Sequence, residues 1–296
     1  MATLAVKKTN SEYTEYLAQF QEIPTLPAVP MRVNELINDP YSSSADIAAV
    51  LKKDQVLTAK VLRLVNSTYY SIPGGVTDVQ RALAYLGFNT IAQLVLGISV
   101  FTLFKDLKSE DFLMSDFWRH ALGTAVCSEV IAKRIKYPKP EEAFTCGLLH
   151  DIGKLVMYLV DPVRFTAIVK KTREKSLSFV EVEKDYDLPG HAFLGEQVAA
   201  KWGLPQVIRL AIHYHHHDVS KKDSVLASAK PAIQIVRLAN TICIKNQFGR
   251  SGDCSTGTIT SEMLESLGLS LSDLKQIETL LEKEIEKAGA FLNAYR

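Results

Sequence analysis

The stretch TCGLLHDIGKLVMY, residues 145–158, places an adjacent histidine and aspartate inside an otherwise apolar run. Its leucines, isoleucine and valine recur with the spacing of the buried face of a helix. A carboxylate and an imidazole buried side by side cost several kcal/mol unless something partners them. The stretch therefore raises the question of what lies opposite His150 and Asp151: a metal ion, a substrate, or only each other.

Helical patterns flank this stretch on both sides. Apolar residues recur at helical spacing through most of the 296-residue chain, with breaks at Pro40, at the Pro-Gly-Gly turn of residues 73–75 and at Gly87. No alternating run of polar and apolar residues is long enough to require a sheet. The sequence therefore predicts an all-α protein, a two-lobed helical bundle built by helix-on-helix packing.

The polar segment KDLKSED, residues 105–111, predicts the boundary between the two lobes. Residues 1–108 are expected to form an N-terminal helical lobe, and residues 109–248 a second lobe that contains the His-Asp pair. A loop rich in glycine and serine and an amphipathic helix over about 270–294 make up the remaining unit, residues 249–296. That tail helix is expected to pack its apolar stripe on one of the two lobes.

Composition argues against several classes of protein. The net charge of +1 provides no broad basic face of the kind that nucleic-acid binding usually needs. The longest apolar stretch, residues 90–104, is interrupted by polar residues and is predicted to be a core helix and not a membrane span. The N-terminus lacks the order of a signal peptide. The four cysteines form no CxxC pair, as expected of reduced thiols in a cytoplasmic protein.

All seven histidines lie between positions 120 and 217, within the second predicted lobe. Asp116 and His120 are four residues apart and share a helix face, as do His150 and Lys154. Histidines on four predicted helices could in this way be directed toward one centre. Imidazole and carboxylate together form a ligand set suited to Fe, Mn, Zn or Ni.

For each histidine alone, an ordinary structural role is the alternative. A histidine at a helix start, such as His191, is more often a cap or a surface residue, and the run at 213–217 could be a solvated helix end favoured by the helix dipole. Asp116 and His120 could simply hydrogen bond within one helix. His150 and Asp151 are the hardest to explain without a partner, because their surroundings are apolar, and the pattern as a whole favours a site.

The motif HDIGK, residues 150–154, resembles the HD superfamily of metal-dependent phosphohydrolases. Residues 18–217 as a whole are similar to its HDOD branch, the HD-related output domain of bacterial signalling proteins. The similarity rests on the prolines of IPTLPAVP, on the segment LVNS at 64–67 and on the segment RALAYLGF that follows them. It covers most of the chain and is less clear over about the last 45 residues.

The resemblance implies a set of metal ligands. The superfamily's site has the pattern H…HD…D, and the related HD-GYP phosphodiesterases of cyclic di-GMP add an acid, a lysine after the HD pair and further histidines. Lys154 matches that lysine by position. The implied metal ligands are Asp116, His120, His150, Asp151, His191, His215, His216 and Asn240.

Two departures from the family pattern bear on function. Asn240 stands where the superfamily has a metal-binding aspartate, and HDVSKKD, which follows the histidine pair, lacks the Gly-Tyr-Pro motif of cyclic di-GMP hydrolases. The implied function is therefore a non-catalytic HDOD signalling module with a retained or vestigial site for Fe, Mn, Ni or Zn, and with a signalling protein or a small ligand as its partner. The alternative is a metal-dependent phosphohydrolase of nucleotides or cyclic dinucleotides, with Asp151 and Lys154 as its catalytic residues.

Overall fold

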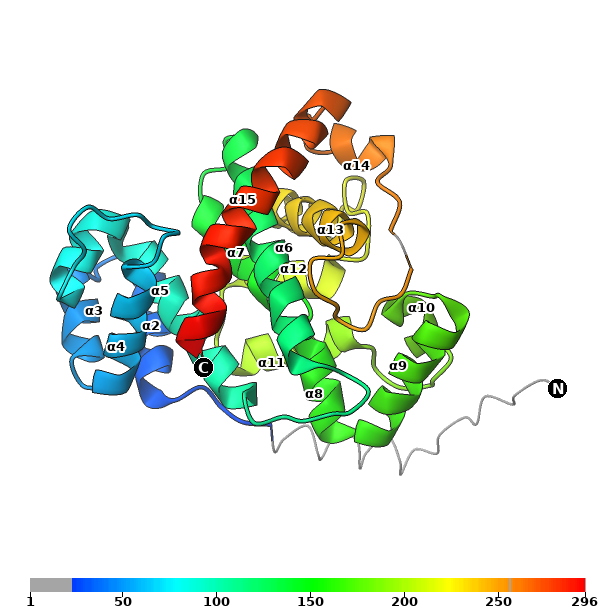
Figure 1. Cartoon of the computed structure of the whole chain (residues 1–296), viewed down its shortest axis with the longest axis horizontal. Coiled ribbons are helices and arrows are strands. Elements are labelled where there is room, and N and C mark those ends of the chain that lie inside the picture. The colour runs from blue at the N-terminus through cyan, green and yellow to red at the C-terminus, as the bar shows by residue number, and fades with distance from the viewer. Residues whose placement is uncertain (1–22, 256, 296) are drawn as a thin grey trace.

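The computed structural model describes residues 23–255 and 257–295, and in these ranges every regular element is a helix (Figure 1). The predicted all-α class is therefore confirmed. The predicted first lobe begins at residue 1, and its residues 1–22 lie outside the described part of the chain.

The N-terminal helices form a bundle around one long helix. α2 (Ala28–Asn38), α3 (Ser44–Leu51) and α4 (Gln55–Val65) all pack against α5 (Val79–Phe104). The predicted break at Gly87 is confirmed, because its φ of 82° and ψ of 167° lie in a region that essentially only glycine adopts. α5 then continues into the second lobe and contacts its helices there.

The second lobe is built around α6 (Met114–Arg134). This helix packs against α7 (Pro140–Leu149), α13 (Lys230–Lys245) and α15 (Leu271–Tyr295). The other helical elements of this part of the chain are α8 (Ile152–Val160), α9 (Pro162–Lys175), α10 (Phe179–Glu183), α11 (His191–Lys201), α12 (Gln206–Tyr214), the short 3-10 helix η1 (Ala227–Ala229) and α14 (Ser261–Glu265).

The helix predicted to run through residues 145–158 is broken at the His-Asp pair. α7 ends at Leu149 and α8 begins at Ile152, with Asp151 at φ −101° and ψ 8° between them. The prediction of one continuous helix was therefore wrong at its centre, because apolar spacing alone does not reveal a bend between two buried helices. The side chains of His150 and Asp151 consequently lie at a bend and not along a helix face.

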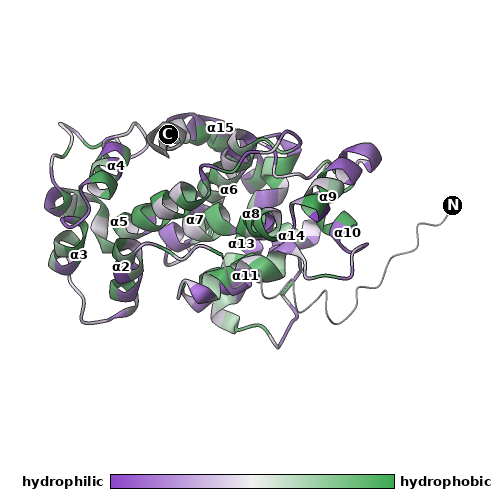
Figure 2. Ribbon diagram, turned by 90° about the horizontal axis from the view of Figure 1, so that it is seen from below, coloured by the Kyte–Doolittle hydropathy of each residue, from purple (hydrophilic) through white to green (hydrophobic). Residues whose placement is uncertain are grey.

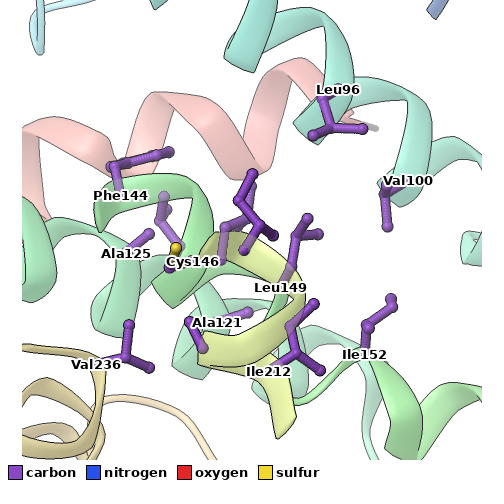
Figure 3. Packing of buried hydrophobic residues seen from close by; sticks show 14 of the residues in the cluster. Leu96, Val100, Ala121, Ala125, Phe144, Cys146, Leu149, Ile152, Ile212 and Val236 are labelled. Atoms are coloured by element: carbon purple, nitrogen blue, oxygen red, sulfur yellow. The ribbon is translucent and has the colours of Figure 1, made fainter. Parts of the chain in front are cut away.

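Apolar side chains on either side of this bend fix its position in the core. Leu149 and Ile152 flank the bend and pack with Ala121 of α6 and Ile212 of α12 in one buried cluster (Figure 3). Apolar faces of the helices turn inward in the same way along much of the molecule (Figure 2). The bend is therefore held within the apolar core of the fold.

The close approach of α8 to α11 requires a glycine. A Cβ atom added at Gly153 would lie 1.8 Å from the carbonyl oxygen of His191 and 2.6 Å from the backbone nitrogen of Gly195. No other residue type fits at such a distance from a neighbouring backbone. Gly153 thus allows the start of α11 to lie against the His-Asp bend.

The tail helix α15 contacts both lobes, where the sequence predicted one. Its buried stripe includes Leu274, Ile277 and Leu281, and the helix packs on α6 and also on α4. The Arg134 Nε donates to the Asp273 Oδ1 at 2.8 Å near its N-terminal end. One apolar core runs through both lobes and the tail, so the boundaries at residues 108 and 248 stay predictions.

Two helical stretches, Val79–Phe104 and Pro140–Val160, are apolar and long enough to cross a membrane by composition and length alone. In their most apolar windows, 50% and 89% of the residues are buried inside the protein. Such burial is typical of core helices, which is the role predicted for residues 90–104.

Replacing Gly153 with alanine should destabilise the second lobe. We expect the free energy of unfolding to fall by about 3 kcal/mol, because the new methyl group must separate α8 from α11. Gly289→Ala in α15 is the matched control, since a methyl group added there meets no described neighbouring atom within 4 Å. Denaturant unfolding measures the free energy of unfolding of both variants. Equal values would contradict the inference that α8 and α11 can approach each other only with a glycine at position 153.

Candidate metal centre

The histidines that the sequence singled out meet around Asp151. Within the described residues, two groups of side chains each place one potential ligand atom per residue within 4.8 Å of all the others. Asp151 belongs to both groups, so they form one continuous cluster. The first group is Asp151, His191, His215 and His216, and the second is His120, His150 and Asp151.

Local backbone contacts orient two of the histidines in the same way. The Nδ1 of His150 donates to the Gly147 carbonyl oxygen at 2.7 Å, and the Nδ1 of His215 donates to the Ile212 carbonyl oxygen at 2.7 Å. Because only a protonated nitrogen can contact a carbonyl in this way, the neutral form of each ring has its lone pair on Nε2. Both lone pairs are directed into the cluster, where Asp151 lies.

Three of these inward-facing atoms have no hydrogen-bond partner among the described residues: the Nε2 of His150, the Nε2 of His215 and the Oδ1 of Asp151. All three belong to fully buried side chains and are acceptors, so they cannot satisfy one another. Leaving a buried acceptor unsatisfied costs about 1–3 kcal/mol. A cation among them would satisfy all three, and nitrogen together with carboxylate oxygen suits a divalent transition metal. The residues present therefore fit a metal ion.

His191 is oriented by a carboxylate that the sequence did not single out. The Glu183 Oε2 accepts from the His191 backbone N–H at 2.8 Å and from its Nδ1 at 2.9 Å. The His191 Nε2 then lies 3.0 Å from the His216 Nε2 and 3.4 Å from the Asp151 Oδ1. A carboxylate behind a histidine in this way fixes the ring and makes it a stronger ligand.

The surroundings set opposite pKa directions within the cluster. Burial lowers the pKa of His120 and of His215 to about 4, which keeps both rings neutral near pH 7. Burial also disfavours the charged form of His191, but the Glu183 and Asp151 carboxylates outweigh it and raise its pKa to about 9. In the absence of a cation, the imidazole of His191 is thus positively charged near pH 7, unlike those of His120 and His215.

Asn240 and Asp116 differ in how they relate to the cluster. The Nε2 of His120 donates to the Oδ1 of Asn240 at 3.0 Å, so Asn240 touches the cluster through that histidine. Asp116 lies half-buried in the first turn of α6, and its carboxylate is in neither of the two groups formed by the described residues. The structure thus brings six of the eight implied ligands together, keeps Asn240 beside them and leaves Asp116 outside.

Lys154 lies beside the cluster and is itself fully buried. Its Nζ donates to the Asp151 Oδ2 at 2.8 Å, to the Asp253 Oδ2 at 2.7 Å and to the Ser251 Oγ at 3.1 Å. The contact with Asp151 follows from the spacing of three residues. Asp253 comes from the glycine- and serine-rich loop, and the sequence offered no signal that separates it from an ordinary loop aspartate.

The geometry agrees with a family match. A family model described as the HDOD domain matches residues 23–218, which is most of the chain. The matched range includes every histidine of the cluster and ends before Asn240 and the loop that carries Asp253.

Two solved structures share this fold over nearly the whole chain. An HDOD domain protein of unknown function from Geobacter sulfurreducens is 26% identical, with a TM-score of 0.78 over 96% of this chain and 98% of that one. A proposed phosphohydrolase from Shewanella amazonensis SB2B is 25% identical, with a TM-score of 0.72 over 94% of this chain and 98% of that one.

A curated relative shares part of its sequence with this chain. It is an uncharacterized protein of Treponema pallidum (strain Nichols), 24% identical over 223 residues, which are 75% of this chain. The chain spans 42% of that protein's length, so it covers less than half of this relative.

Glu183→Gln should weaken metal binding without unfolding the lobe. The amide retains the shape of the carboxylate but no longer strengthens His191 as a ligand, so we expect metal affinity to fall about 10–100-fold. Glu174→Gln, at an exposed position of α9, is the control for the lost charge. Competition with a metal-sensitive dye measures both, and unchanged affinity in Glu183→Gln would show that Glu183 does not support the centre.

Proposed function

The chain belongs to the HDOD domain family, and from that premise we propose that it is a regulatory module of bacterial signalling that binds a divalent transition metal and turns over no substrate. The observation that carries the proposal is the meeting of three buried side-chain atoms, the Nε2 of His150, the Oδ1 of Asp151 and the Nε2 of His215, that have no hydrogen-bond partner among the described residues. We further propose that it acts in the cytoplasm and that its partner is a signalling protein or a small ligand.

The proposed ion would be held at the junction of several helices. Asp151 at the start of α8, His191 at the start of α11 and the histidine pair after α12 supply its ligands. His120 of α6 and His150, directly after α7, could hold a second ion. Fe, Mn, Ni or Zn suits this set of imidazoles and one carboxylate better than Mg²⁺. A bound ion would act as a Lewis acid and would tie these helices together.

Two features favour regulation over catalysis. Asn240 supplies a neutral amide, already bonded to His120, at the position where the family's hydrolases have a carboxylate. Lys154, the cation that could bind a phosphate group, is already paired with the carboxylates of Asp151 and Asp253. A substrate phosphate would therefore have to displace an existing ion pair before it could bind.

The second candidate function is a metal-dependent phosphohydrolase of nucleotides or cyclic dinucleotides. It is favoured by the placement of Lys154 directly beside the potential ligand Asp151, at 2.8 Å. In that function Asp151 would hold the ion, and Lys154 would stabilise negative charge on the phosphate. The structural similarity to the proposed phosphohydrolase of Shewanella amazonensis SB2B points in the same direction.

Elemental analysis of protein purified without chelator tests the metal. We expect about one or two transition-metal ions per chain. His150→Ala should lose most of them and lower the melting temperature by several degrees, because it leaves a cavity and removes a neighbour of the buried Asp151. His213→Ala is the control, since His213 is half-buried and outside both groups. Unchanged metal content and melting temperature in His150→Ala would contradict the proposal.

An assay of the metal-loaded protein separates the two candidate functions. With Fe²⁺ or Mn²⁺, we expect no metal-dependent turnover of nucleotides, cyclic dinucleotides or simple phosphodiesters. Asn240→Asp should raise metal occupancy, because it adds a carboxylate beside His120. Robust turnover by the unaltered chain that disappears in His150→Ala would contradict the regulatory function and favour the phosphohydrolase function.

A further inference from the structure

Residues 249–255 fold against the metal centre, and we refer to this segment as the lid. The backbone N–H of Arg250 donates to the Asp116 carbonyl oxygen on α6 at 3.0 Å. At the other end, the backbone N–H of Cys254 donates to the Leu177 carbonyl oxygen at 3.2 Å. The lid is thus anchored by its backbone on two sides of the centre.

Between these anchors, the side chain of Asp253 reaches inward. Its Oδ2 accepts from the Lys154 Nζ at 2.7 Å and from the Ser251 Oγ at 3.2 Å, while its Oδ1 accepts from the backbone N–H of Phe179 at 2.8 Å. Both carboxylate oxygens are therefore held by donors. The side chain of Asp253 is only 3% exposed, although it belongs to a surface loop.

The donors around Asp253 form a site for an oxyanion. Of these donors, the Lys154 Nζ and the Phe179 backbone N–H lie outside the lid and would hold a phosphate group in the same way as the carboxylate. The Ser251 hydroxyl belongs to the lid and moves with it. The Lys154 Nζ in this site also contacts the Asp151 Oδ2 at 2.8 Å, so the oxyanion position adjoins the metal centre. Asp253 consequently occupies the place where an external anion would meet the centre.

The charge balance supports this interpretation. The buried carboxylates are those of Asp151, Glu183 and Asp253, and Lys154 is the buried cation beside them. With one divalent ion bound by neutral histidines, these charges sum to zero. Moving Asp253 away would leave one positive charge, which favours an anion in its place.

The contacts of Asp253 are ones that a polar ligand can replace, whereas Gly249 packs its backbone directly on α6, where an added Cβ would lie 2.3 Å from the backbone nitrogen of His120. Among its described residues, the side chains that face inward are polar, and its one apolar candidate, Cys254, is exposed. A cavity of about 210 Å³ lies between the lid and α6, lined by His120, Arg250, Ser251 and Asp253 among others. This cavity gives a small ligand a route to the lid and to His120 of the centre.

We propose that the lid is an autoinhibitory element: Asp253 fills the oxyanion position beside the metal centre, and a ligand that carries a phosphate group opens the lid by displacing it. The inference rests on the proposed function, because the oxyanion position is defined by the metal centre. It adds that the regulatory ligand is an oxyanion and that its signal is the release of residues 249–255.

Phosphate binding to the metal-loaded full chain tests the lid. In Asp253→Asn the internal anion is gone, and an internal competitor acts at an effective concentration in the millimolar range or above. We therefore expect calorimetry to show inorganic phosphate binding at least about tenfold more tightly to this variant than to the unaltered chain. Asp223→Asn, at an exposed position outside the lid, is the matched control and should leave phosphate affinity unchanged.

The metal content of the same samples distinguishes a failure of the lid inference from a failure of the proposed function. If the unaltered chain and Asp253→Asn both hold metal but bind phosphate equally, the lid inference is wrong and the proposed function stands. If the unaltered chain holds no metal, the proposed function fails and the inference fails with it.

A second measurement needs no substitution in the lid. Arg250 is exposed, and trypsin can cleave after it once the backbone leaves Asp116 and Leu177. We expect excess phosphate to accelerate cleavage after Arg250 several-fold in the metal-loaded unaltered chain, while cleavage after the exposed Lys222 stays constant. An unchanged or slower rate of cleavage after Arg250 would contradict the inference that phosphate opens the lid.

Discussion

The structure depends on the burial of one carboxylate, that of Asp151, between two helices. A carboxylate that is only 1% exposed must be compensated by opposite charge or by hydrogen bonds. Lys154 compensates one oxygen at 2.8 Å, while the other faces the Nε2 atoms of His191 and His215 at 3.4 and 3.5 Å. Most of the second lobe can be understood as the scaffold that keeps these groups around that carboxylate.

Close backbone packing is what brings the groups together. The bend between α7 and α8 turns His150 and Asp151 inward, and Gly153 lets α11 approach until His191 lies against the bend. Glu183 then fixes the ring of His191 from behind. The centre therefore depends on the packing of α6, α7, α8, α11 and α12, and a change in their contacts would shift the side chains around Asp151.

The cluster and the lid give Lys154 two carboxylate partners, one permanent and one that belongs to a surface loop. An ion pair between a core lysine and a loop aspartate can be exchanged for a pair with an external anion, because the core side need not rearrange. Under the proposed regulatory function, this exchange would let the centre respond to a ligand without turnover of a substrate. The neutral amide of Asn240 and the acidic lid residue Asp253 fit a site that binds and signals.

The sequence by itself determined the helical class and the break at Gly87, because helical periodicity is a local property. The histidines that meet at Asp151 were implied by the resemblance of its motifs to the HD superfamily. Only the tertiary structure revealed the bend inside residues 145–158 and the roles of Glu183 and Asp253. Glu183 is eight residues from His191, and Asp253 is 99 residues from Lys154. Contacts at such separations are set by how helices and loops pack, and no local pattern in the chain encodes them.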